Sequence, residues 1–256
     1  MIVTTEVTKS YGDTCVVDGV SVRLLKGGIT SIIGPNGAGK STLLGMISRL
    51  MGMDRGTVLV DGLDISRTPS DQLARRLSIL RQDNHMTARL TVRDLVSFGR
   101  YPYSKGRLTA DDRQRIDQAI GYLNLLDLAD RFLDELSGGQ RQRAFVAMVL
   151  CQDTDYVLLD EPLNNLDMKH AAGMMTLLRR AANDLGKTVV LVLHDINFAS
   201  WYSDDILAMK NGKVAAQGRP SEIITTEVLR AIYDMEIAVH QIGGQRICVY
   251  YGEAGP

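Results

Sequence analysis

The sequence predicts an α/β fold whose strands and helices alternate along the chain and are interrupted by a helical insertion. First, the short apolar segment at residues 29–33 runs directly into a glycine-rich loop and then into an amphipathic helix. Second, short apolar segments typical of strands return at residues 156–159, 188–193 and 206–209, with a helical pattern at 168–183. Third, residues 88–150 carry mostly helical patterns. Alternating strands and helices indicate an α/β core.

The remaining segments complete this α/β unit. The expected strands and turns are 2–7 and 16–24 around a turn at 11–13, a hairpin at Asp61-Gly62 after 57–60, and a hairpin at Asn211-Gly212 leading to 213–217. The expected helices of the insertion are 92–98, 113–126 and 138–150, with a loop at 99–106; the tail holds a helix at 227–233 and weak strands at 237–241 and 247–251.

These elements predict one domain over residues 1–220. Its core covers about 1–87 and 152–220, and its helical subdomain covers about 88–151. Residues 221–256 form a small C-terminal extension, which we expect to cover an edge of the sheet, because uncovered edge strands invite unwanted pairing.

The composition is that of a globular protein without a bulk affinity for polyanions. Of 256 residues, 45% are hydrophobic and 23% are charged, and the net charge is -1. This balance gives no reason to expect binding to nucleic acid or anionic lipid. The N-terminus lacks a basic stretch followed by an apolar run, so no signal peptide is expected. The longest uninterrupted apolar run, 144–151, is too short to cross a membrane, so any membrane role requires a partner.

A phosphate-binding loop occupies residues 34–42. These are Gly34, Pro35, Asn36, Gly37, Ala38, Gly39, Lys40, Ser41 and Thr42, which satisfy G-x-x-x-x-G-K-[ST] between a strand and a helix. The glycines let backbone N–H groups face phosphates at the start of a helix. Lys40 supplies positive charge to the β- and γ-phosphates, Ser41 offers a hydroxyl to Mg²⁺, and Thr42 adds a contact to phosphate oxygen. The segment alone predicts nucleotide binding.

Two acids end the apolar strand at 156–159. Asp160 is placed to complete Mg²⁺ coordination directly or through water, and Glu161 to polarise a water aimed at the γ-phosphate. A strand ending in a solvated acidic turn is the alternative, which the phosphate-binding loop upstream disfavours.

Three further residues carry weaker signals. Tyr11 lies in a turn before the loop and can stack on a purine, a contact worth about 1–3 kcal/mol, or can simply pack that turn. Gln82 follows an apolar segment and can reach the metal or the attacking water, or can be solvated. His194 ends the strand at 188–193, where it can hydrogen-bond the γ-phosphate or serve a structural role.

The segment Leu136-Ser-Gly-Gly-Gln140 begins a helix. Ser137 and Gln140 form a capping box, which is a sufficient structural reason for these two residues. Gly138 and Gly139 are poor helix formers, costing about 1 kcal/mol each, and suit a close approach of the helix start to an anion. Because the chain already holds one phosphate loop, we expect this second one to bind the ATP held by another copy.

Together these motifs resemble those of the nucleotide-binding subunit of ATP-binding cassette (ABC) transporters, a match that covers about residues 1–220. The resemblance implies a P-loop NTPase core and the following roles: adenine stacking by Tyr11, a Walker A loop at 34–42, metal contacts by Ser41, Gln82 and Asp160, a catalytic base at Glu161, a switch histidine at His194, and nucleotide contacts across a head-to-tail dimer by Ser137, Gly138, Gly139, Gln140 and Asp167. Asn164-Asn-Leu-Asp167 matches the D-loop, where the family more often has Ser-Ala-Leu-Asp.

The segments at 161–170 and 99–103 resemble, within this family, the ATPases of ferric-siderophore importers, which are close to those of cobalamin and haem importers. The resemblance implies ATP and Mg²⁺ as cofactors, a second copy of the chain and a permease as partners, an extracytoplasmic binding protein as an indirect partner, and a place at the cytoplasmic face of the membrane. An exporter subunit remains an alternative. A soluble ABC ATPase acting on nucleic acid is disfavoured, because the chain has one cassette, no heptad run and no basic excess. A signalling GTPase would need Asn-Lys-x-Asp, which is absent.

Overall fold

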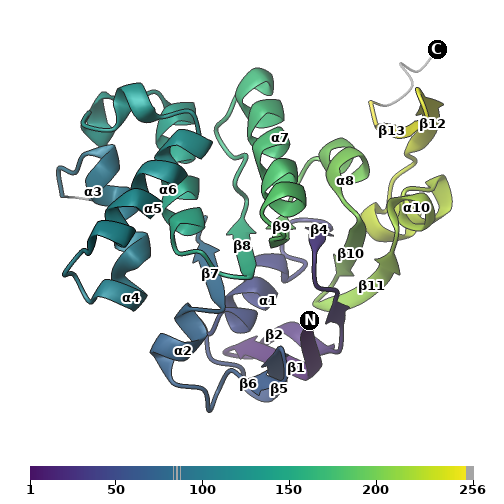
Figure 1. Cartoon of the computed structure of the whole chain (residues 1–256). Helices are drawn as coiled ribbons and strands as arrows, with labels where there is room; N and C mark the ends of the chain where they lie inside the picture. The colour runs from purple at the N-terminus through teal and green to yellow at the C-terminus, as the bar shows by residue number, and fades with distance from the viewer. Residues whose placement is uncertain (83, 85, 87, 252–256) are drawn as a thin grey trace. The chain divides into compact units, whose positions relative to one another are not determined.

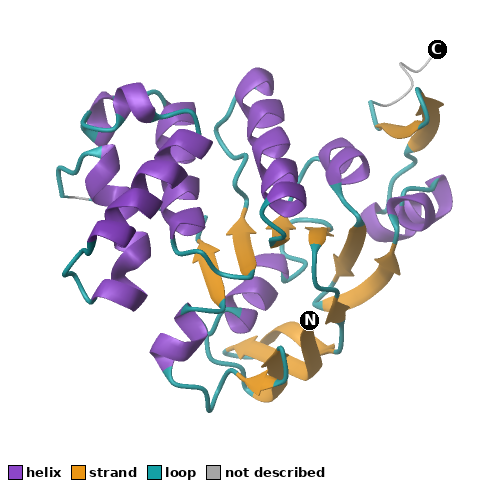
Figure 2. Ribbon diagram, viewed as in Figure 1, coloured by secondary structure: helices purple, strands orange, loops and turns teal. Residues whose placement is uncertain are grey.

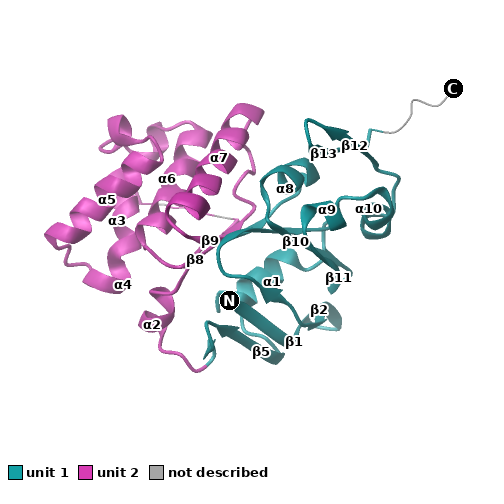
Figure 3. Cartoon of the chain, turned by 45° about the vertical axis from the view of Figure 1, so that its right-hand side comes forward, with its two compact units in different colours: residues 1–66, 190–256 teal, residues 67–189 magenta. Residues whose placement is uncertain are grey.

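The structure is a computed structural model that describes residues 1–82, 84, 86 and 88–251. It divides into two compact units (Figure 3). Unit 1 comprises residues 1–66 and 190–256, and unit 2 comprises residues 67–189. Strand β9 (Thr188–Val192) begins in unit 2 and ends in unit 1. The sequence-based division into core, helical subdomain and extension was drawn from secondary structure and motifs, whereas these two units are defined by contacts. The sequence-based division therefore stays a prediction.

Unit 1 contains most of the strands (Figures 1 and 2). In chain order its elements are β1 (Ile2–Tyr11), β2 (Thr14–Val20), β3 (Arg23–Leu24), β4 (Gly28–Ile33), α1 (Lys40–Ile47), β5 (Arg55–Val60), β6 (Leu63–Asp64), α8 (Ile196–Tyr202), β10 (Asp205–Lys210), β11 (Lys213–Gly218), α9 (Pro220–Ile223), α10 (Thr226–Tyr233), β12 (Ala238–Ile242) and β13 (Gln245–Val249). Strands β2, β1, β5 and β6 are neighbours in that order, and β11, β10 and β4 form a second series.

Strand β4 carries the chain to the phosphate-binding loop. Its residues from Ile29 to Ile33 are buried, and it runs parallel to β10, with Ile32 opposite Leu207. A strand in a parallel sheet is covered on both faces, which explains why its sequence is a continuous apolar run rather than an alternating one. The predicted strand at 29–33 and the predicted hairpin at Asn211-Gly212 are confirmed.

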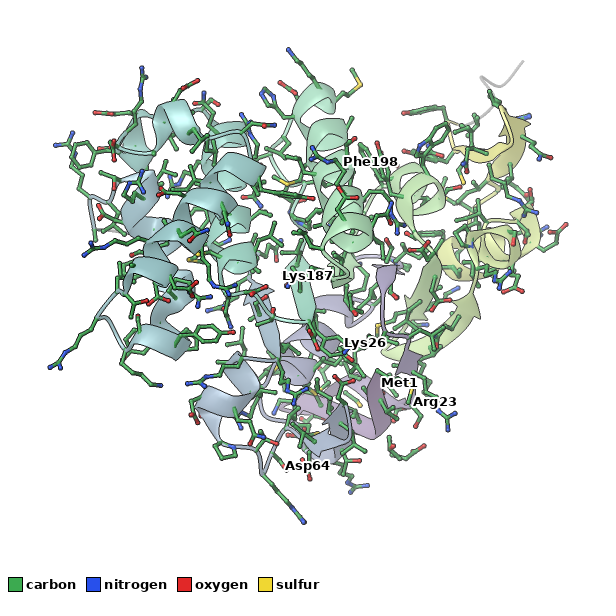
Figure 4. The ribbon with its side chains drawn as sticks, in the orientation of Figure 1. Met1, Arg23, Lys26, Asp64, Lys187 and Phe198 are labelled. Carbon is green, nitrogen blue, oxygen red and sulfur yellow. The ribbon has the colours of Figure 1, made fainter. Side chains whose placement is uncertain are left out.

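The N-terminus is fastened to the hairpin between β5 and β6. The amino group of Met1 lies 2.5 Å from Asp61 Oδ1, and the ammonium group of Lys26 lies 3.7 Å from Asp61 Oδ2. Figure 4 labels both Met1 and Lys26. These are surface pairs, so their main effect is to keep the first residues of β1 in register with β5 rather than to add much stability.

The C-terminal extension packs on two parts of unit 1. Lys210 at the end of β10 donates to Ala231 O at 2.6 Å and to Asp234 Oδ1 at 2.7 Å, which fastens α10 to that strand. The hairpin of β12 and β13 is fastened to α8, because Cys248 N–H donates to Asn197 Oδ1 at 2.7 Å and the Asn197 amide donates back to Cys248 O at 3.2 Å. The C-terminal extension is therefore attached both to strand β10 and to helix α8.

Unit 2 is mainly helical (Figure 2). In chain order its elements are α2 (Ser70–Ala74), β7 (Leu77–Leu80), α3 (Val92–Ser97), η1 (Phe98–Arg100), α4 (Tyr101–Ser104), α5 (Ala110–Tyr122), η2 (Leu126–Leu128), η3 (Leu133–Glu135), α6 (Gly138–Cys151), β8 (Tyr156–Asp160) and α7 (Met168–Asp184). Strand β7 runs parallel to β8, with Leu80 opposite Leu159. The predicted helices at 92–98 and 138–150 and the predicted strand at 156–159 are confirmed.

Three predictions about secondary structure were wrong or incomplete. The predicted loop at 99–106 is helical in its first half, because Pro102 occupies the first turn of α4, where proline needs no N–H partner. The predicted helix at 113–126 begins earlier and ends earlier, as α5, because Thr109 caps it and forms a capping box with Asp112. Helix α8 was not predicted, because its seven residues are too few to show a helical period.

A buried ion pair holds the helices of unit 2 together. Arg100 Nε donates to Asp112 Oδ1 at 2.9 Å, and the side chains are only 4% and 5% exposed. The same guanidinium donates to Cys151 O at 3.0 Å and lies 4.0 Å from the centre of the Tyr103 ring. The pair therefore links η1, α5 and the end of α6. Hydrogen bonds from Thr109, together with the Arg100 guanidinium, hold the pKa of Asp112 below its usual value.

We expect Asp112→Ala to lower the free energy of unfolding by about 3–5 kcal/mol, because it leaves the Arg100 charge buried without a partner. Denaturant unfolding measures the loss. The matched control is Asp184→Ala, which breaks the exposed pair with Arg180 and is expected to cost at most about 1 kcal/mol. Because the pKa of Asp112 is lowered in the folded state, its contribution is present at neutral pH and is lost as pH falls through that pKa. Equal losses in the two variants would contradict this role for the buried pair.

No helix among the described residues is both long enough and apolar enough to cross a bilayer.

Candidate functional site

The phosphate-binding loop of unit 1 depends on glycine at defined places. Gly34 follows β4 with φ 142°, and a Cβ there would lie 2.0 Å from Met209 O. Gly39 precedes α1 with φ 92°, and a Cβ there would lie 2.5 Å from Val16 O. A side chain at either position would collide with backbone, so only glycine permits this loop. Gly37 has φ 77° with open space around it, so its requirement is conformational.

The side chain of Lys40 turns back to the start of its own phosphate-binding loop. Its side chain is buried, and its ammonium group donates to Gly34 O at 2.8 Å and to Pro35 O at 2.9 Å. The positive charge is therefore held at the mouth of the loop by two carbonyls. A phosphate competes well with carbonyl oxygens for an ammonium group, because charge-assisted hydrogen bonds are the stronger ones.

Ser41 and Thr42 follow Lys40 in the first turn of α1, and both are partly exposed. Tyr11 is the last residue of β1 and not part of the turn itself; its ring is 50% exposed. The Tyr11 hydroxyl lies 2.8 Å from Met51 Sδ, and Lys9 Nζ lies 5.7 Å from the ring centre. Tyr11 therefore packs against Met51 in part and is still accessible for stacking.

His194 leaves its strand beside the phosphate-binding loop, within unit 1. The preceding residue, Leu193, donates its N–H to Ile32 O at 3.1 Å, so the two segments run together up to this point. Beyond it, Asp195 caps α8 by accepting from Asn197 N at 2.7 Å. His194 is thus an exposed residue between a strand and a capped helix, next to the strand that ends in Gly34.

The acidic end of β8, in unit 2, forms a cluster with two amide side chains. Tyr156–Leu159 are buried, and Asp160 and Glu161 follow at the partly exposed end. Gln82 Nε2 donates to Glu161 Oε2 at 2.7 Å, and Asn164 Nδ2 donates to the same oxygen. Glu161 also adopts φ 50°, a conformation that side chains rarely adopt and that concentrates at functional sites. The structure therefore brings together two predicted residues, Gln82 and Glu161, and adds Asn164.

The predicted capping box at the start of α6 is confirmed. Gln140 N–H donates to Ser137 Oγ at 3.3 Å, and Ser137 N–H donates to Gln140 Oε1 at 2.9 Å. Gly138 and Gly139 are the first two residues of α6. Ser137 and Gly138 are exposed, so the backbone of Gly138 is accessible at the helix start.

The two glycines of this turn have different surroundings. A Cβ at Gly138 would meet nothing nearer than Asn165 O at 3.9 Å, whereas a Cβ at Gly139 would lie 2.8 Å from the imidazole ring of His170. Gly139 is buried, and its close packing against His170 is possible because glycine has no side chain. Sequence reasoning did not single out His170; its spacing of three residues from Asp167 was the available signal.

Asp167 and His170 form the start of α7. Asp167 Oδ1 accepts from the His170 backbone N–H at 2.8 Å and lies 2.8 Å from His170 Nδ1. The backbone hydrogen bond and the side-chain contact lower the pKa of Asp167. Gln142 Nε2 of α6 also donates to Pro162 O at 3.0 Å. The segment after Glu161 is therefore bonded to α6 through Gln142 and to the first turn of α7 through His170.

The predicted site residues thus fall into two groups. Tyr11, residues 34–42 and His194 belong to unit 1, whereas Gln82, residues 137–140, Asp160, Glu161 and Asp167 belong to unit 2. The first group fits a triphosphate, because its loop leads into the N-terminus of α1 and its lysine supplies positive charge. The hydroxyl and carboxylate oxygens of Ser41 and Asp160 are ligands that Mg²⁺ prefers.

Comparison with known proteins agrees with this site. The sequence model of the family described as ABC transporter matches residues 17–164. The chain is 56% identical to the petrobactin import ATP-binding protein YclP of Bacillus subtilis (strain 168), over 98% of this chain and 100% of that protein. It is 39% identical to the ferric enterobactin transport ATP-binding protein FepC of Escherichia coli (strain K12), over 98% and 94%.

Solved structures agree as well. An inward-facing conformation of a putative metal-chelate type ABC transporter matches with a TM-score of 0.83 and 25% identity, over 98% of both chains. The dimeric ATP-binding cassette MJ0796, bound to ADP and Pi, matches with a TM-score of 0.76 and 30% identity, over 86% of this chain and 99% of that one. This chain belongs to the ABC transporter family and is an ATP-binding subunit that hydrolyses ATP.

Proposed function

We propose that this chain energises the uptake of ferric siderophores across the cytoplasmic membrane. The observation that carries the proposal is full-length similarity to import subunits: YclP and the petrobactin import ATP-binding protein FatE of Bacillus anthracis are 56% and 54% identical to this chain, over 98% and 93% of its length. Relatives named for enterobactin and hydroxamate import match at 39% and 38%. The shared cargo chemistry of these names is a chelated ferric ion.

The proposed cycle uses a head-to-tail pair of copies. ATP binds with its phosphates on Lys40 and the backbone of the phosphate-binding loop, and Tyr11 stacks on the adenine. Ser137, Gly138 and Gly139 of the second copy contact the γ-phosphate, so closure of the pair depends on charge-assisted contacts made in trans. The dimeric structure of MJ0796 supports such a pair for a related cassette.

Hydrolysis follows from the acidic end of β8. Glu161 orients the attacking water and accepts its proton, and His194 holds the γ-phosphate. Mg²⁺, held by Ser41, Asp160 and Gln82, neutralises charge on the β- and γ-phosphates when it is bound. The hydrogen bond between Gln82 and Glu161 supports a link between a proposed metal ligand and the proposed base.

The permease partner is proposed to dock near residues 83–105. Within this range, Asp83, His85 and Thr87 lie outside the described residues. Beyond them, Phe98 and Tyr101 are 47% and 59% exposed on neighbouring helical turns, and large exposed apolar side chains of this kind suit a protein partner. Gln82 precedes this surface and would couple it to Glu161. An extracytoplasmic binding protein would deliver cargo to the permease, and the complex would lie at the cytoplasmic face of the membrane.

Uptake of radiolabelled iron tests the proposed function. Host cells carrying wild type, Lys40→Ala or Lys213→Ala receive iron bound to a panel of siderophores that includes petrobactin, with haem and cobalamin as parallel cargos. We expect Lys40→Ala to abolish uptake of at least one ferric siderophore. Lys213→Ala is the matched control, because it removes an exposed lysine of the same unit whose pair with Asp18 is on the surface.

The outcomes separate the alternatives. Loss of haem or cobalamin uptake with unchanged iron uptake would keep the mechanism and change the cargo. Unchanged uptake of every cargo would contradict the importer and would leave an exporter as the alternative.

A further inference from the structure

One carboxylate oxygen of Glu161 accepts two amide hydrogen bonds from two separate loops. Gln82 Nε2 reaches it at 2.7 Å from 79 residues upstream, and Asn164 Nδ2 reaches it from the segment that follows Glu161. Both amide side chains are exposed, while Glu161 is partly buried. An exposed amide can bond to water instead, so it does not need a protein partner. That two exposed amides donate to the same carboxylate oxygen therefore indicates a preferred geometry.

Asn164 is held in place by the fold of its own loop. Its backbone N–H donates to Glu161 O at 3.2 Å, and Leu166 N–H donates to Leu163 O at 3.2 Å, so the segment turns tightly. Glu161, with φ 50°, starts this turn in a strained conformation. The side chain of Asn164 therefore returns to the same residue to which its backbone is bonded. This contact is local, whereas the contact of Gln82 crosses between distant segments.

The segment that follows Asn164 leads into contacts with α6 and α7. Pro162 O accepts from Gln142 of α6, and Asp167 caps α7 through His170, whose ring packs on Gly139. The segment that carries Asn164 is therefore connected to α6 and to the start of α7. The amide of Asn164 connects that segment to the Glu161 carboxylate.

We propose that Asn164 is a positioning residue for the catalytic base, and that it holds Glu161 Oε2 whether or not Gln82 also donates to that oxygen. The inference rests on the proposed roles of Glu161 and Gln82. Asn164 fixes the rotation of the Glu161 carboxylate so that its other oxygen faces the attacking water. The orientation of the carboxylate then depends on the position of the segment between Glu161 and α7. Asn164 donates this hydrogen bond through an amide, whereas the serine that is more common at this position in the family would donate it through a hydroxyl.

Asn164→Asp tests the assignment on the purified chain, because it keeps the size of the side chain, removes the N–H donor and places a second carboxylate beside Glu161. We expect kcat for ATP hydrolysis to fall by about ten- to hundred-fold, the range for a misplaced catalytic group, with KM for ATP changed by less than about three-fold. Asn164→Ser retains a donor on the same backbone and is expected to lie nearer to wild type. Asn165→Asp adds the same charge one residue further along and is expected to lose much less. Equal losses at the two positions would overturn the assignment.

A double-mutant cycle separates positioning from a general structural effect. If Asn164 acts through Glu161, Asn164→Asp causes no further loss in residual turnover when Glu161 is already glutamine. Additive losses would overturn the proposal, as would a variant that hydrolyses ATP like wild type. Either result leaves the import experiment untouched, because that experiment depends on Lys40 and on cargo, whereas this one compares variants of a chain whose wild type hydrolyses ATP.

Discussion

Glu161→Gln is expected to reduce ATP turnover by about 10²–10⁴-fold, the usual contribution of a positioned general base. Glutamine keeps the length and shape of the side chain and can still accept hydrogen bonds from Gln82 and Asn164 through its amide oxygen, so the cluster is preserved. It cannot accept a proton from water at neutral pH. Release of phosphate from ATP, measured at saturating ATP and Mg²⁺, gives the effect on kcat.

The same variant is expected to accumulate as an ATP-bound dimer, because in the proposed cycle closure precedes hydrolysis and hydrolysis reopens the pair. Size-exclusion chromatography with ATP and Mg²⁺ measures this directly. Glu227→Gln is the matched control, since it makes the same change on the exposed side of α10 and is expected to remain at the wild-type rate and oligomeric state. Loss of turnover without dimer formation would contradict the trans contacts, and retained turnover would contradict the assignment of Glu161.

The parts of the site that could be predicted from sequence are those set by local chemistry. The strand leading to Gly34, the capping box of Ser137 and Gln140, and the acidic end of β8 each follow from a few consecutive residues. Glycine in the phosphate-binding loop was predicted for the freedom of its backbone, and the structure adds a second reason at Gly34, whose missing side chain makes room for Met209 O. That second reason depends on a residue far away in the sequence.

The parts that could not be predicted are contacts between distant or atypical residues. The role of Gly139 as packing space for His170 requires the placement of α6 against the start of α7. Attachment of the C-terminal hairpin to α8 depends on the pairing of Asn197 with Cys248, and an isolated asparagine in a short helix gives no such signal. Asn164 was noted only as a departure from the family pattern, because its hydrogen bond to Glu161 depends on a tight turn that propensities do not reveal.

Gly138→Asp is expected to change activity and stability in opposite directions. The position is exposed, at the first turn of α6, and a Cβ there would have no neighbour within 3.4 Å, so the subunit folds. Aspartate at a helix start is favoured by the helix dipole by about 0.3–1 kcal/mol, and it replaces a poor helix former. ATP turnover is nevertheless expected to fall by at least about a hundred-fold, because a carboxylate would stand where the proposed cycle places the γ-phosphate of the partner copy.

Thermal unfolding and ATPase rates, measured on the same preparation, provide the comparison. Gly173→Asp on α7 is the matched control, since it makes the same substitution at another exposed helical glycine with open space around it, and it is expected to keep the ATPase rate. Gly139→Ala should behave differently from Gly138→Asp, because it strains the contact with His170 and lowers stability, and His170→Ala should recover that stability. A Gly138→Asp chain that is as active as wild type would contradict an anion at this helix start.

Mixing two inactive variants decides whether that anion belongs to the partner. Suppose that each site joins the phosphate-binding loop of one copy to residues 137–140 of the other. A pair made of one Lys40→Ala chain and one Gly138→Asp chain then contains one site with both defects and one site with neither. Mixed preparations should then regain turnover that neither variant shows alone. If each site were built within one chain, both sites of the mixed pair would carry a defect and turnover would stay absent. Recovered activity therefore distinguishes a site shared between copies from one completed within a single chain.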